Sequence, residues 1–297
     1  MNETCQRLRL TQPFKWIGSK VRMRSKLLEI FQEIPRKLYV EPFGGSGAMF
    51  FGKAPENSVY NDKNGLLVNF FRKLRSRRDR ETIQEIATYT PQNSEYWHEF
   101  KIVCKAWNNG DDDKLNAALE RANLAEYDVE TAVAFAFFYC QRLAFGGTFL
   151  HAYGEYLKPD CVCSYNRCVG DLSEYAKHLT QTSITRRDFA ECIEKHDHPQ
   201  TLFYCDPPYE CASSVDYQSS WGGEDSKRLV EILCNVKGNV VLSCYDCEIY
   251  YPLLDCGYIR RSFDVRSSLR AKDKFENSAR VETVYIKNNA AKLARLF

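Results

Sequence analysis

The amino-acid sequence predicts a doubly wound α/β sheet that is interrupted by a mostly helical insert. Short apolar runs typical of buried strands occupy both ends of the chain. The first of them, residues 37–41, leads into a glycine-rich loop, as at the ligand-binding turn of a doubly wound sheet. In the middle of the chain, apolar residues recur instead at helical spacing. We therefore expect a sheet domain built from residues 1–70 and 183–297, and an insert at residues 71–182.

Seven strand-like runs and four helical patterns carry this prediction. The strand-like runs lie at residues 37–41, 58–60, 182–185, 202–205, 239–243, 259–265 and 281–287. The helical patterns lie at residues 80–89, 96–107, 114–121 and 131–143. Apolar residues 49–51, after the glycine loop, predict the start of a further helix. Residues 144–154 mix glycine with aromatic residues, which is typical of a hairpin or an ordered loop.

The composition is that of a protein with a well-developed hydrophobic core. Of the 297 residues, 44% are hydrophobic and 27% are charged. No apolar run approaches the length of a membrane span, and the N-terminus lacks the apolar core of a signal peptide. We therefore expect a cytoplasmic protein without a membrane partner.

Thirteen cysteines without a secretion signal predict free thiols in a reducing compartment rather than a disulfide framework. Zinc is the competing use of these thiols. Cys244 and Cys247 have the C-x-x-C spacing, and Cys161, Cys163 and Cys168 cluster in a loop-like region. No second C-x-x-C pair stands at a finger-like distance, and the existing pair follows a run typical of a buried strand. We expect mostly small apolar fillers and no bound metal.

Asp206-Pro207-Pro208-Tyr209 is the segment that points most directly to a reaction. It follows residues 201–205, a run typical of a buried strand, where a carboxylate is costly unless it is used. The prolines remove backbone donors and leave carbonyls that only accept hydrogen bonds. With a stacking ring beside them, these acceptors fit a planar base with an exocyclic amine. The alternative is an ordinary Asp-Pro turn. Because no partner for Asp206 is evident, its removal is expected to cost little stability.

The glycine-rich loop supplies a second candidate site. Gly44, Gly45 and Gly47 allow backbone N–H groups to approach a ligand at the head of the sheet. Asp62 follows the second strand-like run, about 20 positions past the loop, where an acidic residue typically binds a ribose diol. A glycine turn alone is weak evidence because loops use glycine anyway. The loop and Asp62 together favour a ligand that contains a ribose.

Basic residues gather in one place although the net charge is only +2. Six of them fall within nine positions: Arg72, Lys73, Arg75, Arg77, Arg78 and Arg80. Such a cluster fits either a solvated helix face or contacts to DNA phosphates, which position a protein without reading sequence.

The order of these motifs resembles the Dam-like class of DNA adenine-N6 methyltransferases, the alpha group, over most of the chain. Further motifs at residues 14–20, 187–189, 215–217, 242–245 and 279–284 fit the same family. The resemblance implies a Rossmann-like, S-adenosylmethionine-dependent methyltransferase sheet of seven strands with an antiparallel C-terminal hairpin. It also implies that the sheet domain is catalytic and that the insert recognises the DNA target.

The resemblance implies three groups of site residues. The catalytic group is Asp206, Pro207, Pro208 and Tyr209. The group that binds S-adenosylmethionine is Trp16, Lys20, Glu41, Phe43, Gly44, Gly45, Ser46, Gly47, Asp62, Asp188, Phe189 and Asp206. The group that binds the substrate is Tyr209, Tyr217, Arg142 and Phe145. Within the second group, Lys20 would pair with the carboxylate of the methyl donor, and the Asp188–Phe189 pair would contact its adenine. Asp188 would also cap the helix that follows it.

Two departures from the family pattern concern the target and the cofactor loop. Members of this class that read GATC carry an Arg- and Asn-rich hairpin with a Phe-Asn-Val-Pro run. Residues 141–154 retain an Arg, an aromatic residue and a Gly of it, but not the residues expected to read that site. A different recognition sequence is therefore expected, with Arg142 as the side chain able to read a guanine edge in this segment. Glu41 stands where many members have Asp.

The sequence thus predicts an enzyme that transfers methyl from S-adenosylmethionine to N6 of an adenine flipped out of double-stranded DNA. A separately acting restriction endonuclease could share its target site. Three alternatives remain: cytosine N4 as the acceptor, RNA or a protein glutamine as the acceptor, and a DNA-binding relative without turnover.

Overall fold

The computed structural model describes residues 10–16, 18–144, 153–154, 159–208, 221–265 and 280–289. The chain packs into two compact units. The helical unit comprises Met1–Ser19, Gly45–Glu56 and Asp62–Arg186, and the sheet unit comprises Lys20–Gly44, Asn57–Asn61 and Arg187–Phe297. The chain passes between the units inside the glycine loop, at Gly44, and again before Asp62.

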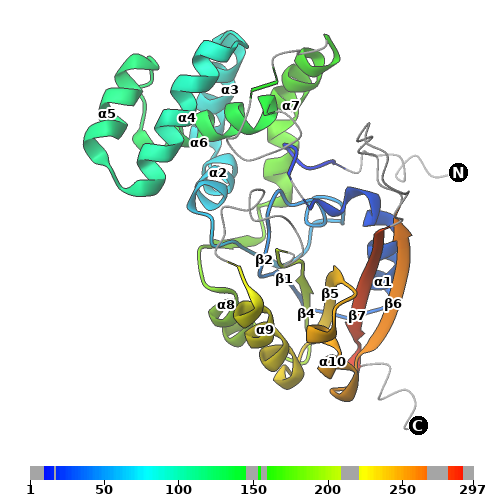
Figure 1. The fold of residues 1–297 in the computed structure, drawn as a ribbon. Helices are drawn as coiled ribbons and strands as arrows, with labels where there is room; N and C mark the ends of the chain where they lie inside the picture. The colour runs from blue at the N-terminus through cyan, green and yellow to red at the C-terminus, as the bar shows by residue number, and fades with distance from the viewer. Residues whose placement is uncertain are drawn as a thin grey trace, which may run out of the picture. The chain divides into compact units, whose positions relative to one another are not determined.

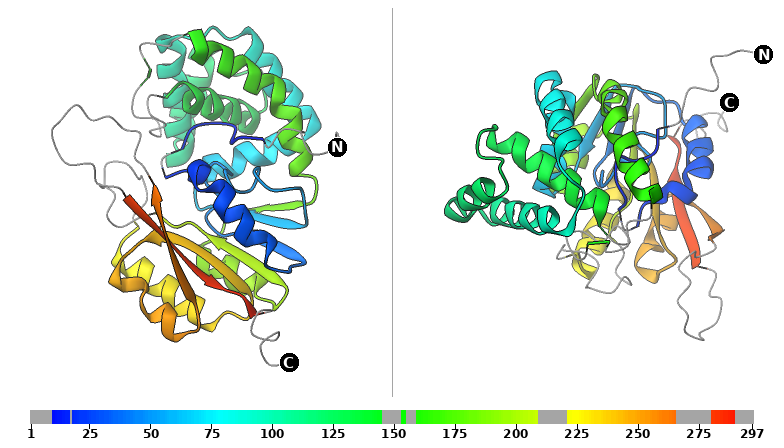
Figure 2. Two further views of the ribbon diagram at one scale, coloured as in Figure 1. Left: turned by 90° about the vertical axis from the view of Figure 1, so that its right-hand side faces the viewer. Right: turned by 90° about the horizontal axis from the view of Figure 1, so that it is seen from above.

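Seven strands form one sheet in the order β3-β2-β1-β4-β5-β7-β6. Their bounds are β1 Leu38–Glu41, β2 Ser58–Asn61, β3 Thr182–Thr185, β4 Thr201–Cys205, β5 Asn239–Tyr245, β6 Ile259–Val265 and β7 Arg280–Lys287. β1 pairs in parallel with β2 and with β4, and β4 pairs in parallel with β5. β7 is antiparallel to both β5 and β6, and the β6–β7 pair is long and twisted (Figure 2). This confirms the predicted doubly wound sheet with an antiparallel C-terminal pair.

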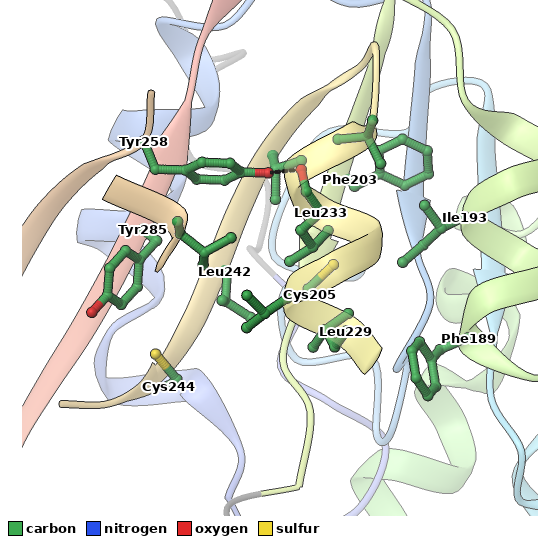
Figure 3. Packing of buried hydrophobic residues seen from close by; sticks show 14 of the residues in the cluster. Phe189, Ile193, Phe203, Cys205, Leu229, Leu233, Leu242, Cys244, Tyr258 and Tyr285 are labelled. Atoms are coloured by element: carbon green, nitrogen blue, oxygen red, sulfur yellow. Dashed lines mark hydrogen bonds between the residues drawn. The ribbon is translucent and has the colours of Figure 1, made fainter. Parts of the chain in front are cut away.

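The core of the sheet unit follows from the alternation of side chains along its strands. β4 sends Phe203 and Cys205 toward α8 (Phe189–His196) and α9 (Gly223–Asn235), where they join a buried cluster (Figure 3). Tyr204, which lies between them in the sequence, instead contacts Phe31 of α1 (Arg24–Gln32), with ring centroids 5.2 Å apart. Helices therefore cover both faces of the parallel strands, which explains why nearly every residue of β1, β2, β4 and β5 is buried.

The helical unit is organised around α6 (Val129–Leu143), most of whose residues are buried. The other helices of the unit are α2 Gly65–Arg75, α3 Arg77–Tyr89, α4 Ser94–Asn109, α5 Asp112–Arg121 and α7 Pro159–His178 (Figure 1). The four predicted helical patterns correspond to α3, α4, α5 and α6. None of the helices in the described part of the chain is both long and apolar enough to cross a bilayer.

Three local predictions were wrong. No helix follows the glycine loop, because Gly45 and Gly47 adopt positive φ angles of 50° and 72° and lead the chain into a series of turns. α2 was not predicted, because its first two turns are almost continuously apolar and its basic residues Arg72, Lys73 and Arg75 come together in the last turn. The region around Cys161, Cys163 and Cys168, taken for a loop, belongs to α7.

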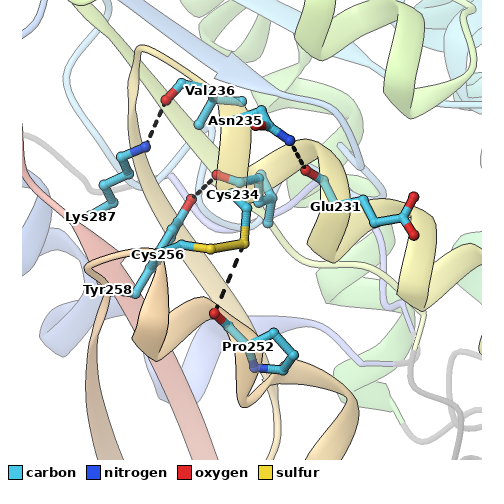
Figure 4. The surroundings of a disulfide bond; sticks show 9 residues. Glu231, Cys234, Asn235, Val236, Pro252, Cys256, Tyr258 and Lys287 are labelled. Carbon is cyan, nitrogen blue, oxygen red and sulfur yellow. Dashed lines mark hydrogen bonds between the residues drawn. A yellow bond between two sulfur atoms is a disulfide. The ribbon is translucent and has the colours of Figure 1, made fainter.

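One disulfide also departs from the prediction of free thiols. Cys234, near the end of α9, is bonded to Cys256, which follows α10 (Pro252–Asp255) (Figure 4). No local pattern pointed to this pair, because the partners lie 22 positions apart and outside any cysteine motif. Other cysteines, among them Cys168 and Cys244, are free and buried.

Candidate functional site

The carboxyl ends of β1 and β4 define the first part of the candidate site, in the sheet unit. These parallel neighbours mark the point where the strand order reverses, which is where open α/β sheets bind ligands. β1 ends at Glu41, and β4 leads directly into Asp206, Pro207 and Pro208. The sheet thus brings two acidic residues, 165 positions apart in the chain, to one edge.

Asp206 is held by a buried lysine. Lys20 lies in the short 3-10 helix η2 (Lys20–Arg22), and its Nζ is 2.8 Å from Oδ1 of Asp206. The Lys20 side chain is only 4% exposed, and that of Asp206 is 20% exposed. This corrects the expectation that Asp206 has no local partner. It also gives Lys20 an anionic partner within the protein, in place of the predicted role of binding the donor carboxylate alone.

Glu41 is the more deeply buried of the two acidic groups, at 1% exposure. The Tyr39 hydroxyl donates to its Oε1 at 2.5 Å. Burial raises the pKa of the neighbouring Tyr204 well above its ordinary value, and the negative charges of Asp206 and Glu41 raise it further. Its hydroxyl is also 3.3 Å from the hydroxyl of Ser243. Glu41 is therefore fixed by the protein's own tyrosine.

The glycine loop follows β1 and is anchored at both ends. Gly44 donates its N–H to the carbonyl of Asn61 at 2.8 Å, and a β-carbon at Gly44 would lie 2.2 Å from Cε2 of Tyr60. Only glycine therefore fits this position without displacing a fully buried ring. At Gly47, a positive φ of 72° and a contact of 2.6 Å from an added β-carbon to Phe51 impose the same choice.

Asp62 contacts the glycine loop within the helical unit. Its Oδ2 accepts the N–H of Gly45 at 2.8 Å, and its Oδ1 accepts the N–H of Asn64 at 2.8 Å. Burial raises the pKa of Asp62 above its ordinary value, and the backbone hydrogen bonds, led by that of Asn64, oppose the rise. The N–H of Lys63 is a third backbone donor to this carboxylate, so about one of its roughly four acceptor positions is left for a ligand hydroxyl.

Gln12 is a loop-positioning residue that sequence reasoning missed. Its Oε1 accepts hydrogen bonds from the hydroxyls of Ser46, at 2.8 Å, and Ser19. Trp16 lies nearby, with Nε1 3.4 Å from the place of a β-carbon on Gly45. The predicted Trp16 is therefore next to the loop, whereas Gln12 stands outside every motif and left no signal in the sequence.

Asp188 and Phe189 form a third group, at the start of α8. As predicted, Asp188 caps the helix, its Oδ1 accepting the N–H of Ala190 at 2.9 Å. Phe189 is 6% exposed and packs against Phe43 and Trp221, with ring centroids 5.4 and 5.3 Å away. The predicted Phe43 and Phe189 thus belong to one aromatic cluster, to which Trp221 is an unexpected addition.

Arg142, predicted to read a base, holds the N-terminal segment in this structure. Its Nη1 donates to the carbonyl of Pro13 at 3.3 Å and its Nη2 to the hydroxyl of Ser164 at 2.6 Å. The neighbouring Gln141 donates to the carbonyl of Lys15 at 2.8 Å. Base reading by Arg142 stays a prediction. Phe145, Tyr209 and Tyr217, and thus their predicted roles, lie outside the described residues.

Most of the basic cluster is engaged within the protein. Arg72 and Arg75 donate to the carbonyls of Ile184 and Thr182 in β3. Lys73 lies within 4 Å of three carboxylates, those of Asp79, Asp128 and Glu130. Arg77 pairs with Glu81 at 2.8 Å, and Arg80 donates to the carbonyl of Leu74. These side chains therefore already have partners within the protein, and their predicted contacts to DNA phosphates stay a prediction.

The described residues give no indication of a metal centre. Among them, no three His, Cys, Asp or Glu side chains gather as metal ligands would. Of the C-x-x-C pair, Cys244 is buried in β5, and burial raises its pKa well above the ordinary value, which disfavours the thiolate.

Comparison with known proteins adds a family to this geometry. A sequence model of the D12 class N6 adenine-specific DNA methyltransferases matches residues 16–277. The chain is 27% identical over 234 residues to a DNA N-6-adenine-methyltransferase of Escherichia phage P1, covering 74% of the chain but only 27% of that relative. It is 31% identical over 217 residues to the type II methyltransferase M1.LlaDCHI of Lactococcus lactis subsp. cremoris, covering 72% and 71% of the two chains. A DNA adenine methylase of Haemophilus influenzae is 25% identical over 201 residues, covering 67% of this chain and 64% of its own length.

Proposed function

The chain belongs to the D12 class of N6 adenine-specific DNA methyltransferases, and we propose that it methylates adenine in double-stranded DNA with S-adenosylmethionine as the donor. The target adenine would be flipped out of the helix, because its amine is out of reach inside the stack. A restriction endonuclease that acts separately on the same site would be its partner. The family match favours adenine over the cytosine N4, RNA and protein acceptors considered from sequence.

The observation that carries the proposal is Asp206 at the end of β4, fixed by Lys20 and followed by two prolines. The lone pair of an adenine amine is delocalised into the ring, so the amine is a weak nucleophile. Asp206 and a proline carbonyl can accept its two hydrogens and favour the pyramidal form that attacks. The buried ammonium of Lys20, 2.8 Å from Oδ1, holds the Asp206 carboxylate in place as an acceptor. The proton leaves late or through water.

The residues around the glycine loop fit the donor by their chemistry. S-adenosylmethionine supplies the electrophilic methyl group when it is bound. Asp62 would accept a hydrogen bond from the ribose diol, and Asp188 one from the amine of its adenine. Gly44, Gly45, Ser46 and Gly47 would provide close backbone contacts, with Trp16 and Phe43 packing on the ligand. Glu41 and the Lys20–Asp206 pair would lie toward its charged amino-acid end.

Substrate contacts complete the proposal. Tyr209 would stack on the flipped adenine, and Tyr217 would support it. Arg142 and Phe145 would contact DNA next to the target, and the absence of the GATC-reading residues implies another recognition sequence.

A transfer assay with a labelled donor tests the proposal. The protein is incubated with tritiated S-adenosylmethionine and unmethylated double-stranded DNA, and the nucleosides are then separated. Label in N6-methyldeoxyadenosine is expected, and Asp206→Ala is the matched control without transfer. Label in N4-methyldeoxycytidine would contradict the acceptor. Donor binding without any transfer would reveal a silent DNA-binding relative.

A further inference from the structure

Arg228, on α9, belongs to no sequence motif but contacts the Asp188–Phe189 pair. Its Nη2 is 2.6 Å from Oδ1 of Asp188, and its Nη1 is 3.3 Å from Oδ2. The guanidinium also lies over the ring of Phe189, with Cζ 4.8 Å from the centroid. One side chain thus contacts both members of the Asp188–Phe189 pair.

The hydrogen bonds around Asp188 leave its carboxylate little freedom. The two Arg228 donors and the N–H of Ala190 use three of its acceptor positions, two of them on Oδ1. A carboxylate has about four such positions, so the remaining one is on Oδ2 and points in a fixed direction. An arginine that donates to both oxygens also fixes the plane of the carboxylate. Asp188 is therefore set up as an acceptor for a single donor hydrogen.

Phe189 is enclosed in a way that limits its own role. Phe43 stacks on it with an interplanar angle of 29°, Arg228 covers it, and Trp221 packs beside it. Because Phe189 is only 6% exposed, it supports the aromatic cluster more than it offers a free face to a ligand. The polar recognition of a base at this place consequently depends on Asp188.

We propose that Arg228 is a positioning residue for the adenine of the methyl donor. It holds the Asp188 carboxylate in one orientation, so that Oδ2 accepts one hydrogen of the 6-amino group and selects adenine over a 6-oxo purine. The inference rests on the proposed function, because it takes Asp188 to bind the donor's adenine. A lysine would keep the charge but not the two-pronged geometry, so arginine is required for full selectivity.

The competing role of Arg228 is purely structural, as a clamp between α9 and the start of α8. The two roles differ in what a substitution changes. A clamp would affect thermal stability and weaken all ligands alike. A positioning residue would specifically reduce the preference for a 6-amino group.

Arg260 provides a matched control. It makes the same two kinds of contact, an ion pair to Asp246 at 3.2 Å and a cation–π contact with Tyr251 at 5.7 Å. It is about as exposed as Arg228, at 40% against 46%. Arg260 is not among the residues assigned to the donor, so Arg260→Ala measures the general cost of losing such a residue.

The experiment compares two ligands by isothermal titration calorimetry. S-adenosylhomocysteine carries the 6-amino group, and S-inosylhomocysteine carries a 6-oxo group at the same position. The wild-type protein is expected to prefer the first, and Arg228→Ala to lose about tenfold of this preference, as for one charge-assisted hydrogen bond. The preference of Arg228→Lys for the 6-amino ligand should lie between those of wild type and Arg228→Ala. The preference of Arg260→Ala should match that of wild type. Thermal melting checks that each variant is folded, and steady-state kinetics should show a raised KM for the donor with little change in kcat.

Each other outcome is decisive. An unchanged preference in folded Arg228→Ala or Arg228→Lys would overturn the positioning role. Equal binding of both ligands by wild type would show that Asp188 does not recognise the 6-amino group. The proposal that S-adenosylmethionine is the donor would be unaffected. Failure of wild type to bind either ligand would overturn both this inference and the proposed donor.

Discussion

At the scale of single residues, the Lys20–Asp206 pair changes what removal of the carboxylate should do. We expect Asp206→Ala and Asp206→Asn to reduce methyl transfer by at least ~10²-fold, the usual loss for a key electrostatic group. Because Lys20 is buried and 2.8 Å from this carboxylate, stability should also fall, by roughly 1–3 kcal/mol. This reverses the sequence-based expectation of little cost. Transfer assays and denaturant titrations on both variants provide the measurements, and transfer above about a hundredth of wild type would refute the catalytic role.

Asp62 leads to a pH-dependent prediction. Burial raises its pKa, so the free protein takes up this proton at a higher pH than an ordinary aspartate would. Ligand hydroxyls that donate to Asp62 favour its ionised form, so donor affinity should rise as pH increases through this pKa and be lost as pH falls below it. The loss should begin above the ordinary range of an aspartate.

The control for Asp62 is the isosteric amide. Asp62→Asn should bind S-adenosylmethionine more weakly near neutral pH. Its affinity should no longer fall with the titration of residue 62 as the pH decreases, whereas any pH dependence from the ligand itself remains. The ribose contact is present in ground and transition states alike, so KM should change more than kcat. Calorimetry from pH 7 downward supplies the comparison. The same loss of affinity at low pH in the variant would show that another group causes it.

Gln12 offers a test of the loop geometry that no motif suggested. Gln12→Ala removes the acceptor shared by Ser46 and Ser19, so the glycine loop should be less well ordered and the KM for the donor should rise several-fold, with kcat nearly unchanged. Gln12→Glu keeps an acceptor oxygen and should restore most of the affinity. An unaltered KM in Gln12→Ala would show that Ser46 needs no such support.

At the scale of elements, the sequence was most informative where one physical signal dominates. All seven strands were located because each is a short β-branched or aromatic run bounded by polar residues. α2 and α7 were missed for different reasons. α2 begins with an almost continuous apolar run and gathers its basic residues in its last turn, and α7 carries cysteines and a glycine in a polar context. The helix expected after Gly47 fails because two positive-φ glycines commit the chain to turns.

Only those residues of the candidate site that belong to sequence motifs were predictable. Asp206, Asp62 and the glycines could be identified because each is a characteristic residue type next to the end of a predicted strand. Gln12, Arg228 and the ion pair of Lys20 with Asp206 depend on tertiary contacts between segments that no local pattern connects. Long-range partners of this kind are decided by packing and not by spacing.

The Cys234–Cys256 bond gives a prediction about α9 and α10. It joins residues 22 positions apart, and closing a loop of this size stabilises the folded state by about 3 kcal/mol. Reductant should therefore lower the Tm of the wild-type protein. Cys234→Ser combined with Cys256→Ser should lower it equally and abolish the effect of reductant, whereas Cys247→Ser should leave that effect intact. A Tm that does not respond to reductant would show that the bond does not form in solution.

At the scale of the whole molecule, a net charge of +2 means that DNA affinity must come from local patches. The neighbours Arg77 and Arg78 form a natural pair for testing this, because both are exposed on α3 but Arg77 is already paired with Glu81. We expect Arg78→Ala to weaken binding to all DNA sequences and to reduce the slope of log K against log salt by about one. Arg77→Ala should have a smaller effect, since its charge is partly neutralised within the protein. Filter binding over a salt series provides the slopes. Equal slopes for Arg78→Ala and wild type would place the phosphate contacts elsewhere, and the basic cluster would then be a structural feature that holds α2 and α3 in place.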